Sequence, residues 1–277
     1  MTIFSAQKRP RTEADACDFL CAGAQKAGTT WLWANLGQHP QVKMPLVKEV
    51  HYFDRLYLGT DIPTNVDQHR EAALACAAKL KGAEAANFLA IAQGCDAPDD
   101  GWYRRLFAQR GGKFSGDITP AYLCLGLRGV QHVQRLSPNL RVIILVRDPQ
   151  SRMTSGLAMS MARNPGRIPM RILENWQFQE RGNYAAHIPI WDHIFGDQVR
   201  YIPFGRIRTA PRDVLAEVEA HIGLMPFGGY ENPAQVHNSF PPAEGLAAGV
   251  LQRIEQIAAR QSAYLLERFG ADFCAEI

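Results

Sequence analysis

The sequence has little that would point to a secreted or membrane-spanning protein. Its 277 residues include only six cysteines, which form no C-x-x-C pair and no zinc-type spacing with histidine, so we predict reduced, packed thiols and no metal site. No apolar run approaches the roughly 18 residues of a membrane span. Residues 1–16 are polar and lack the apolar segment of a signal peptide. We therefore expect a cytoplasmic protein with a flexible N-terminus over residues 1–16 and no transmembrane segment.

The sequence also lacks a strong charge of either sign. Thirty Lys and Arg residues face 27 Asp and Glu, a net charge of +3, and no long basic run occurs. This balance excludes an extended nucleic-acid footprint, although it is compatible with a small anionic ligand. A hydrophobic content of 47% is typical of an ordinary globular protein. We predict one domain over residues 17–277, and we find no signal for its oligomeric state.

Short apolar segments alternate with segments of helical periodicity. Residues 18–23 predict a strand, and residues 28–38 a helix. Residues 142–146 are apolar on both faces, as in a strand buried in a parallel sheet. Asp148 and Pro149 then predict the start of a helix. The pattern continues with a helix at 184–195, a strand at 199–204, a helix at 211–222 and a last helix from about 246 to 269, ended by Gly270.

This alternation predicts an α/β fold, a P-loop-like parallel sheet flanked by helices on both faces. Two less regular regions, near residues 55–112 and 163–183, interrupt it. Loops over a rigid α/β scaffold often carry specificity, so we assign both insertions to acceptor recognition, with simple packing insertions as the alternative.

A glycine-rich loop, residues 23–30, lies between the first predicted strand and helix. Its glycines are spaced as in a P-loop, in which backbone N–H groups and the following helix N-terminus form an anion cradle. A Walker A sequence would have lysine where this chain has Thr29, and the lysine lies inside the loop at Lys26 instead. The loop therefore predicts a phosphate-like ligand and disfavours an ordinary magnesium-nucleotide hydrolase.

A second candidate anion site follows residues 142–146. Arg147 leaves the carboxyl end of this predicted strand and Ser155 lies two turns into the next helix, so both can face the crevice where open α/β sheets bind ligands. Arginine suits bidentate phosphate recognition. Taken alone, Arg147 is better explained by a structural ion pair with Asp148 or Glu180. Together with the glycine-rich loop, it indicates one ligand with two separated phosphates.

In combination, these segments resemble the sulfotransferases that use 3′-phosphoadenosine 5′-phosphosulfate (PAPS), in particular their heparan-sulfate-type and bacterial branch. Residues 23–32 resemble the family's 5′-phosphosulfate loop, and residues 141–156 its 3′-phosphate motif. Residues 48–54, KEVHYFD, resemble the segment with the catalytic glutamate in heparan sulfate 3-O-sulfotransferases. Residues 116–122 resemble the Thr-Pro-x-Tyr element, but Ile118 replaces the lysine usual in heparan enzymes, which argues against a heparan-like acidic acceptor.

The resemblance implies roles for individual residues, with PAPS as the sulfuryl donor and no metal. Glu49 would be the base, unless it forms an exposed ion pair with Lys48. His51 would be catalytic, or else a buried, hydrogen-bonded core histidine. Lys26 would act on the leaving-group oxygen. The residues expected to bind the nucleotide are Lys26, Ala27, Gly28, Thr29, Thr30 and Trp31 at its 5′ side, and Arg147 and Ser155 at its 3′ side.

The predicted reaction is in-line sulfuryl transfer from PAPS to a hydroxyl or amine of a small-molecule, lipid or carbohydrate acceptor. Two other classes stay open. A P-loop kinase would use Asp148 as a magnesium ligand and depend on that metal. A non-catalytic PAPS-binding protein would keep both anion sites and lose the base.

Overall fold

A parallel sheet forms the centre of the molecule. The computed structural model describes residues 15–59, 63–237 and 246–277. Four parallel strands lie in the order β2-β1-β3-β4. The strands are β1 (Phe19–Gly23), β2 (Gly116–Ile118), β3 (Arg141–Val146) and β4 (Val199–Pro203). β1 is buried along its whole length and β3 from its second residue onward, so the predicted central strands are confirmed.

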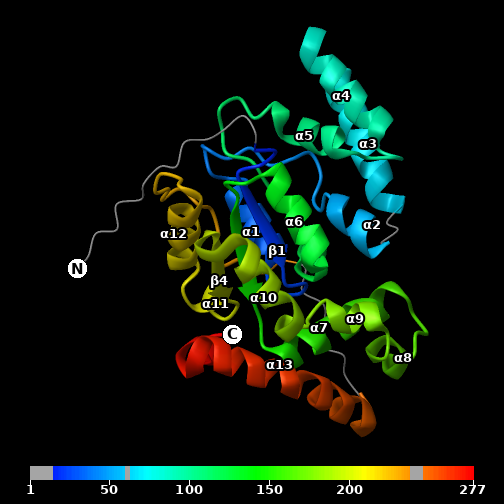
Figure 1. The fold of residues 1–277 in the computed structure, drawn as a ribbon, viewed down its shortest axis with the longest axis vertical. Helices are drawn as coiled ribbons and strands as arrows, with labels where there is room; N and C mark the ends of the chain where they lie inside the picture. Colours follow the sequence, from blue (N-terminus) through cyan, green and yellow to red (C-terminus); the bar gives the residue numbers. More distant parts are fainter. Residues whose placement is uncertain (1–14, 60–62, 238–245) are drawn as a thin grey trace.

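Helices flank this sheet, which confirms the predicted α/β fold. In Figure 1, α12 lies on one side of the strands, and α6 and α10 pack together on the other. The helices are α1 (Thr29–Leu36), α2 (Tyr52–Leu58), α3 (Pro63–Ala77), α4 (Gly82–Gly94), α5 (Asp100–Ala108), α6 (Gly126–Leu136), α7 (Pro149–Arg163), α8 (Pro169–Leu173), α9 (Trp176–Glu180), α10 (Tyr184–Phe195), α11 (Arg206–Thr209), α12 (Pro211–Ile222) and α13 (Ala248–Ala275), with 3₁₀ turns at Pro120–Cys124 and Gly196–Gln198.

The first predicted insertion is more regular than its sequence indicates. Helices α3, α4 and α5 occupy most of residues 63–108 and extend away from the sheet (Figure 1). Alanine is the best helix former, and its abundance here outweighs the Gly, Pro and Asp residues between the helices. The second insertion contains the short helices α8 and α9.

The two ends of the chain also differ from expectation. Most of the predicted flexible N-terminus, residues 1–14, lies outside the described residues. Its last two residues are buried: the Asn139 amide donates to Asp15 Oδ1 (3.1 Å) and the Ala16 amide to the Leu136 carbonyl (2.9 Å). Gly270, with φ 81° and ψ 173°, breaks α13 at the residue predicted to end the helix, and a second helical segment that was not predicted follows it to Ala275. Within the described ranges, no helix is both long and apolar enough to cross a membrane.

The parallel strands bring several loops to one edge of the sheet. The Ala24 amide donates to the Leu145 carbonyl (2.9 Å), and the Phe204 amide to the Val146 carbonyl (2.7 Å). The segments that leave β1, β3 and β4 therefore start side by side at their carboxyl ends, where ligand sites form in open α/β sheets.

Candidate active site

A cavity of about 860 Å³, the main cavity, opens at this edge of the sheet. The glycine-rich loop, one face of α7 along its whole length and the segment around Glu49 all contribute to its wall. The structure thus brings together segments that are more than 100 residues apart in sequence. The predicted site residues that line the main cavity are Lys26, Gly28, Thr29, Thr30, Trp31, Glu49, His51, Arg147 and Ser155.

Ala27 differs from the other predicted site residues. It is fully buried behind the loop, and its amide donates to the Ala24 carbonyl (3.2 Å) instead of pointing into the main cavity. The next residue, Gly28, has a positive φ of 94° at the start of α1, and a Cβ there would lie 2.7 Å from Ile207 Cδ1. Only glycine suits this turn, which presents the N-terminus of α1 to the cavity.

Arg147 is held at the wall of the main cavity by uncharged groups. Its Nη1 donates to the Lys26 carbonyl (2.8 Å), and its guanidinium carbon lies 4.5 Å from the centre of the Phe204 ring. Its Nε is buried and has no hydrogen-bond partner among the residues that the structure describes. Neither alternative ion pair forms among the described residues: Asp148 accepts the Ser151 amide (2.7 Å) as the cap of α7, and Glu180 pairs with His187. A half-buried guanidinium that no described carboxylate neutralises is suited to an anionic ligand.

The main cavity has a strong excess of positive charge. Burial, together with the neighbouring Arg147 and Arg163, lowers the pKa of Lys26 to about 8. Three of the lining arginines were not predicted. Arg208 follows β4 at the ligand-binding edge, so strand topology could have indicated it. Arg163 is the last residue of α7, and Arg181 comes from the second insertion. The cationic lining residues are Lys26, Arg147, Arg163, Arg181 and Arg208, against the carboxylates Glu49 and Asp148.

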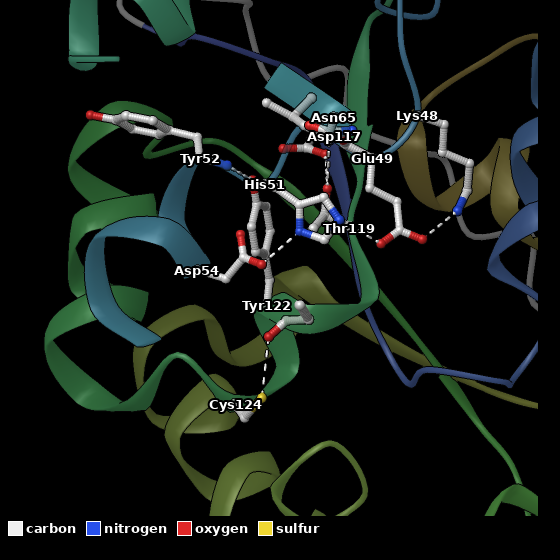
Figure 2. A network of polar contacts seen from close by, with 12 residues as sticks. Lys48, Glu49, His51, Tyr52, Asp54, Asn65, Asp117, Thr119, Tyr122 and Cys124 are labelled. Carbon is white, nitrogen blue, oxygen red and sulfur yellow. Dashed lines mark hydrogen bonds and ion pairs between the residues drawn. The ribbon is translucent and has the colours of Figure 1, made fainter. Parts of the chain in front are cut away.

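Acid–base groups form a second cluster in the wall of the main cavity. Figure 2 shows Glu49 between Lys48 and His51, with Asp54 on the far side of the imidazole. Lys48 Nζ lies 2.9 Å from Glu49 Oε1, and His51 Nε2 lies 3.1 Å from Glu49 Oε2. His51 Nδ1 lies 2.6 Å from Oδ2 of Asp54, which is fully buried. The Lys48–Glu49 pair predicted as an alternative does form, but at the cavity wall and as part of this network.

These contacts fix the protonation states of the network. Burial opposes the charge of His51, but hydrogen bonds to Asp54 and Glu49 outweigh it and raise the pKa of His51 to about 9. Burial likewise opposes ionisation of Glu49, yet the hydrogen bond from His51 and the charge of Lys48 lower its pKa to about 2. An imidazolium between two carboxylates is therefore the resting state near neutral pH.

The Thr-Pro-x-Tyr element, residues 119–122, holds the backbone of this network through hydrogen bonds. Thr119 Oγ1 accepts the Val50 amide (3.0 Å), and the Tyr122 hydroxyl accepts the Tyr52 amide (3.0 Å; Figure 2). Asn65 Nδ2 donates to the Glu49 carbonyl (2.7 Å), which no sequence pattern indicated. Ile118 is fully buried in β2 and does not line the main cavity.

Comparison with known proteins places this arrangement in context. The model of the "Sulfotransferase family" matches residues 19–227. Heparan sulfate glucosamine 3-O-sulfotransferase 6 from Homo sapiens is 24% identical over 217 residues, which cover 74% of this chain and 52% of that protein. The Mus musculus protein of the same name matches with the same identity and coverage. The chain thus spans about half the length of the curated relatives it matches.

Solved structures share the fold at low sequence identity. A sulfotransferase from Alicyclobacillus acidocaldarius superposes with a TM-score of 0.68 at 20% identity, covering 94% of this chain and 98% of that one. The sulfotransferase domain of the Synechococcus PCC 7002 olefin synthase gives a TM-score of 0.58 at 18% identity, covering 87% and 92%. At these identities the likeness shows a common fold.

Proposed function

The chain belongs to the sulfotransferase family, and we propose that it transfers the sulfuryl group of PAPS to a hydroxyl or amine of a small-molecule, lipid or carbohydrate acceptor. One observation carries the proposal: the main cavity joins a cationic, glycine-rich anion cradle to a carboxylate held in its ionised form. Sulfuryl transfer requires both, because negative charge grows on the leaving phosphate while the acceptor loses a proton.

The donor end would bind both phosphates of the nucleotide. The N-terminus of α1, with Thr29 and Thr30, fits the 5′-phosphate, and Lys26 would stabilise the charge on the leaving oxygen. Arg147 and Ser155 would hold the 3′-phosphate. The unpartnered Nε of Arg147 supports this assignment, since a phosphate oxygen would supply the missing acceptor.

Glu49 would take the acceptor proton. In the transfer, the bond from the acceptor oxygen to sulfur forms, the bond from sulfur to the phosphate oxygen breaks, and the proton passes to a Glu49 carboxylate oxygen. A pKa of about 2 makes Glu49 a weak base, so we expect the proton to move late, once bonding to sulfur has made it acidic. His51 would orient the carboxylate, with Asp54 holding its other nitrogen.

A panel of ligands in thermal unfolding tests this function against its alternatives. We expect 3′-phosphoadenosine 5′-phosphate (PAP) at 100-fold its Kd to raise the apparent stability by about 2.7 kcal/mol, with or without chelator. Stabilisation by Mg-ATP that chelator abolishes, without a response to PAP, would support the kinase alternative. Labelled PAPS then distinguishes a sulfotransferase from a non-catalytic PAPS-binding protein. Binding without transfer to any acceptor of a broad panel would favour the non-catalytic protein.

A further inference from the structure

A second cavity, of about 280 Å³, lies on the opposite side of α7 from the main cavity. α7 contributes Ser151 and Ser155 to the main cavity and Arg152 and Met153 to the second one. α13 and residues 179–183 complete its wall. The charged lining residues of the second cavity are Arg152, Glu180, Arg253 and Arg260.

Arg152 is a buried charge for which no described residue supplies a counter-ion. Its exposed fraction is 2%, and its Nε and Nη1 are buried without a hydrogen-bond partner in the part of the chain that the structure describes. A Cβ on Gly182 would lie 2.2 Å from Arg152 Nε, so the guanidinium packs directly against this glycine. Phe178 lies nearby, with its ring centre 5.9 Å from the guanidinium carbon. An unpaired buried guanidinium is costly unless a bound group pairs with it.

The neighbouring carboxylates are engaged elsewhere. Glu180 accepts from Asn183 Nδ2 (3.0 Å) and lies 2.8 Å from His187 Nε2. Glu174 binds Arg253 through both of its oxygens, at 2.9 and 3.3 Å. Arg260 is exposed at the rim and forms no ion pair with any described residue. The second cavity therefore has two arginines, Arg152 and Arg260, available for an external anion.

We propose that the second cavity is a binding site for a tetrahedral oxyanion, a phosphate or sulfate, held between Arg152 and Arg260. Arginine matches the oxygen geometry of both ions. The bound anion links α7 to α13 and to residues 179–183, and Arg181 of that segment lines the main cavity. The site is separate from the donor site, and the inference does not rest on the proposed function.

Thermal unfolding in sulfate tests the site, with chloride at equal ionic strength as the reference. All variants carry Arg147→Ala, which weakens anion binding in the main cavity. We expect sulfate to raise Tm in this background and in the matched control Arg128→Ala, an exposed arginine outside both cavities. Arg260→Ala should lose the response, and because Arg260 is exposed this variant should fold. Equal responses in Arg260→Ala and Arg128→Ala would overturn the proposal.

A crystal soaked in tungstate locates the anion directly. We expect an anomalous peak between the Arg152 and Arg260 guanidinium groups, and its absence at saturating tungstate would overturn the proposal.

A comparison of inorganic phosphate with glycerol phosphate then shows whether the site takes a free ion or the phosphate group of an organic molecule. Tighter binding of the ester assigns the ligand as an organic phosphate, and equal binding as a free ion, both in support of the site.

Discussion

The main cavity contains two groups of charged residues, the proposed donor end with Lys26 and Arg147 and the proposed acceptor end with Glu49 and His51, and they differ in how their charges are compensated. At the donor end, burial lowers the pKa of both Lys26 and Arg147, and the charge of Arg147 further lowers the pKa of Lys26. At the acceptor end, Glu49 and His51 are paired through contacts of 3.1 Å or less, including the one to Asp54. We therefore expect the donor end to depend on the charge that a ligand brings, whereas contacts within the protein already fix the side chains of the acceptor end.

The two ends also differ in how they make the stability of the fold depend on pH. The raised pKa of His51 contributes stability that is complete below its ordinary value of 6.5 and is lost as pH rises through about 9. The lowered pKa of Glu49 contributes stability that is present above 4.5 and is lost as pH falls through about 2. The lowered pKa of Lys26 instead costs folding stability, because the charged form is disfavoured in the empty folded protein. This cost is complete below about pH 8 and disappears as pH rises through the ordinary value of 10.5.

The largest expected effect comes from breaking the acceptor end. We expect Glu49→Gln to slow transfer by about 10²–10⁴-fold, the usual contribution of a positioned general base, because Gln keeps the shape but cannot take the proton. PAP affinity should stay nearly unchanged, since PAP lacks the sulfuryl group and the acceptor on which Glu49 would act. Single-turnover transfer from labelled PAPS and calorimetric titration with PAP measure the two quantities.

His51→Ala is the companion variant. If His51 only orients Glu49, its loss should cost less than Glu49→Gln and shift the pH dependence of transfer. A loss equal to or greater than that of Glu49→Gln would make His51 the base. Transfer by Glu49→Gln at the parental rate across the pH range would show that the carboxylate is structural.

The two ends also differ in how far sequence could predict them. The glycine-rich loop and Arg147 each follow a short apolar strand directly, so local patterns place them at the same sheet edge. Arg163 ends α7 eight residues after Ser155, so helical spacing alone could have placed it on the cavity side of that helix. The contribution of Arg181 depends on how the second insertion folds over the cavity, which no local pattern encodes. Likewise, the sequence motif of residues 48–54 is enough to predict their place in the site. The hydrogen bonds from this segment to Thr119 and Asn65 arise only from tertiary packing, so sequence does not predict them.

A smaller effect is expected from breaking the donor end at Arg147. Arg147→Ala should weaken PAPS and PAP binding by about 1.5–3 kcal/mol, ~10- to 150-fold, the range for a hydrogen bond to a charged group. The rate at saturation should change little, because the 3′-phosphate would be held equally in the ground and transition states. Arg147→Lys, which keeps the charge and loses the fork, should be intermediate. A large fall in kcat with an unchanged KM would instead place Arg147 at the reacting atoms.

The smallest and most specific effect concerns the proton on Lys26. With a pKa of about 8, Lys26 is largely neutral at pH 9 in the empty protein, and a bound phosphate should restore its charge. PAP binding should therefore take up a fraction of a proton at pH 9, and affinity should fall by at most about tenfold per pH unit above 8. Calorimetry in two buffers with different ionisation enthalpies measures this uptake.

Because His51 also titrates near pH 9, the matched control is Lys26→Met, in which the uptake due to Lys26 should vanish while any part due to His51 remains. Equal uptake in the two proteins would show that the protonation of Lys26 does not change when the nucleotide binds. The contrast between the two ends would then not hold.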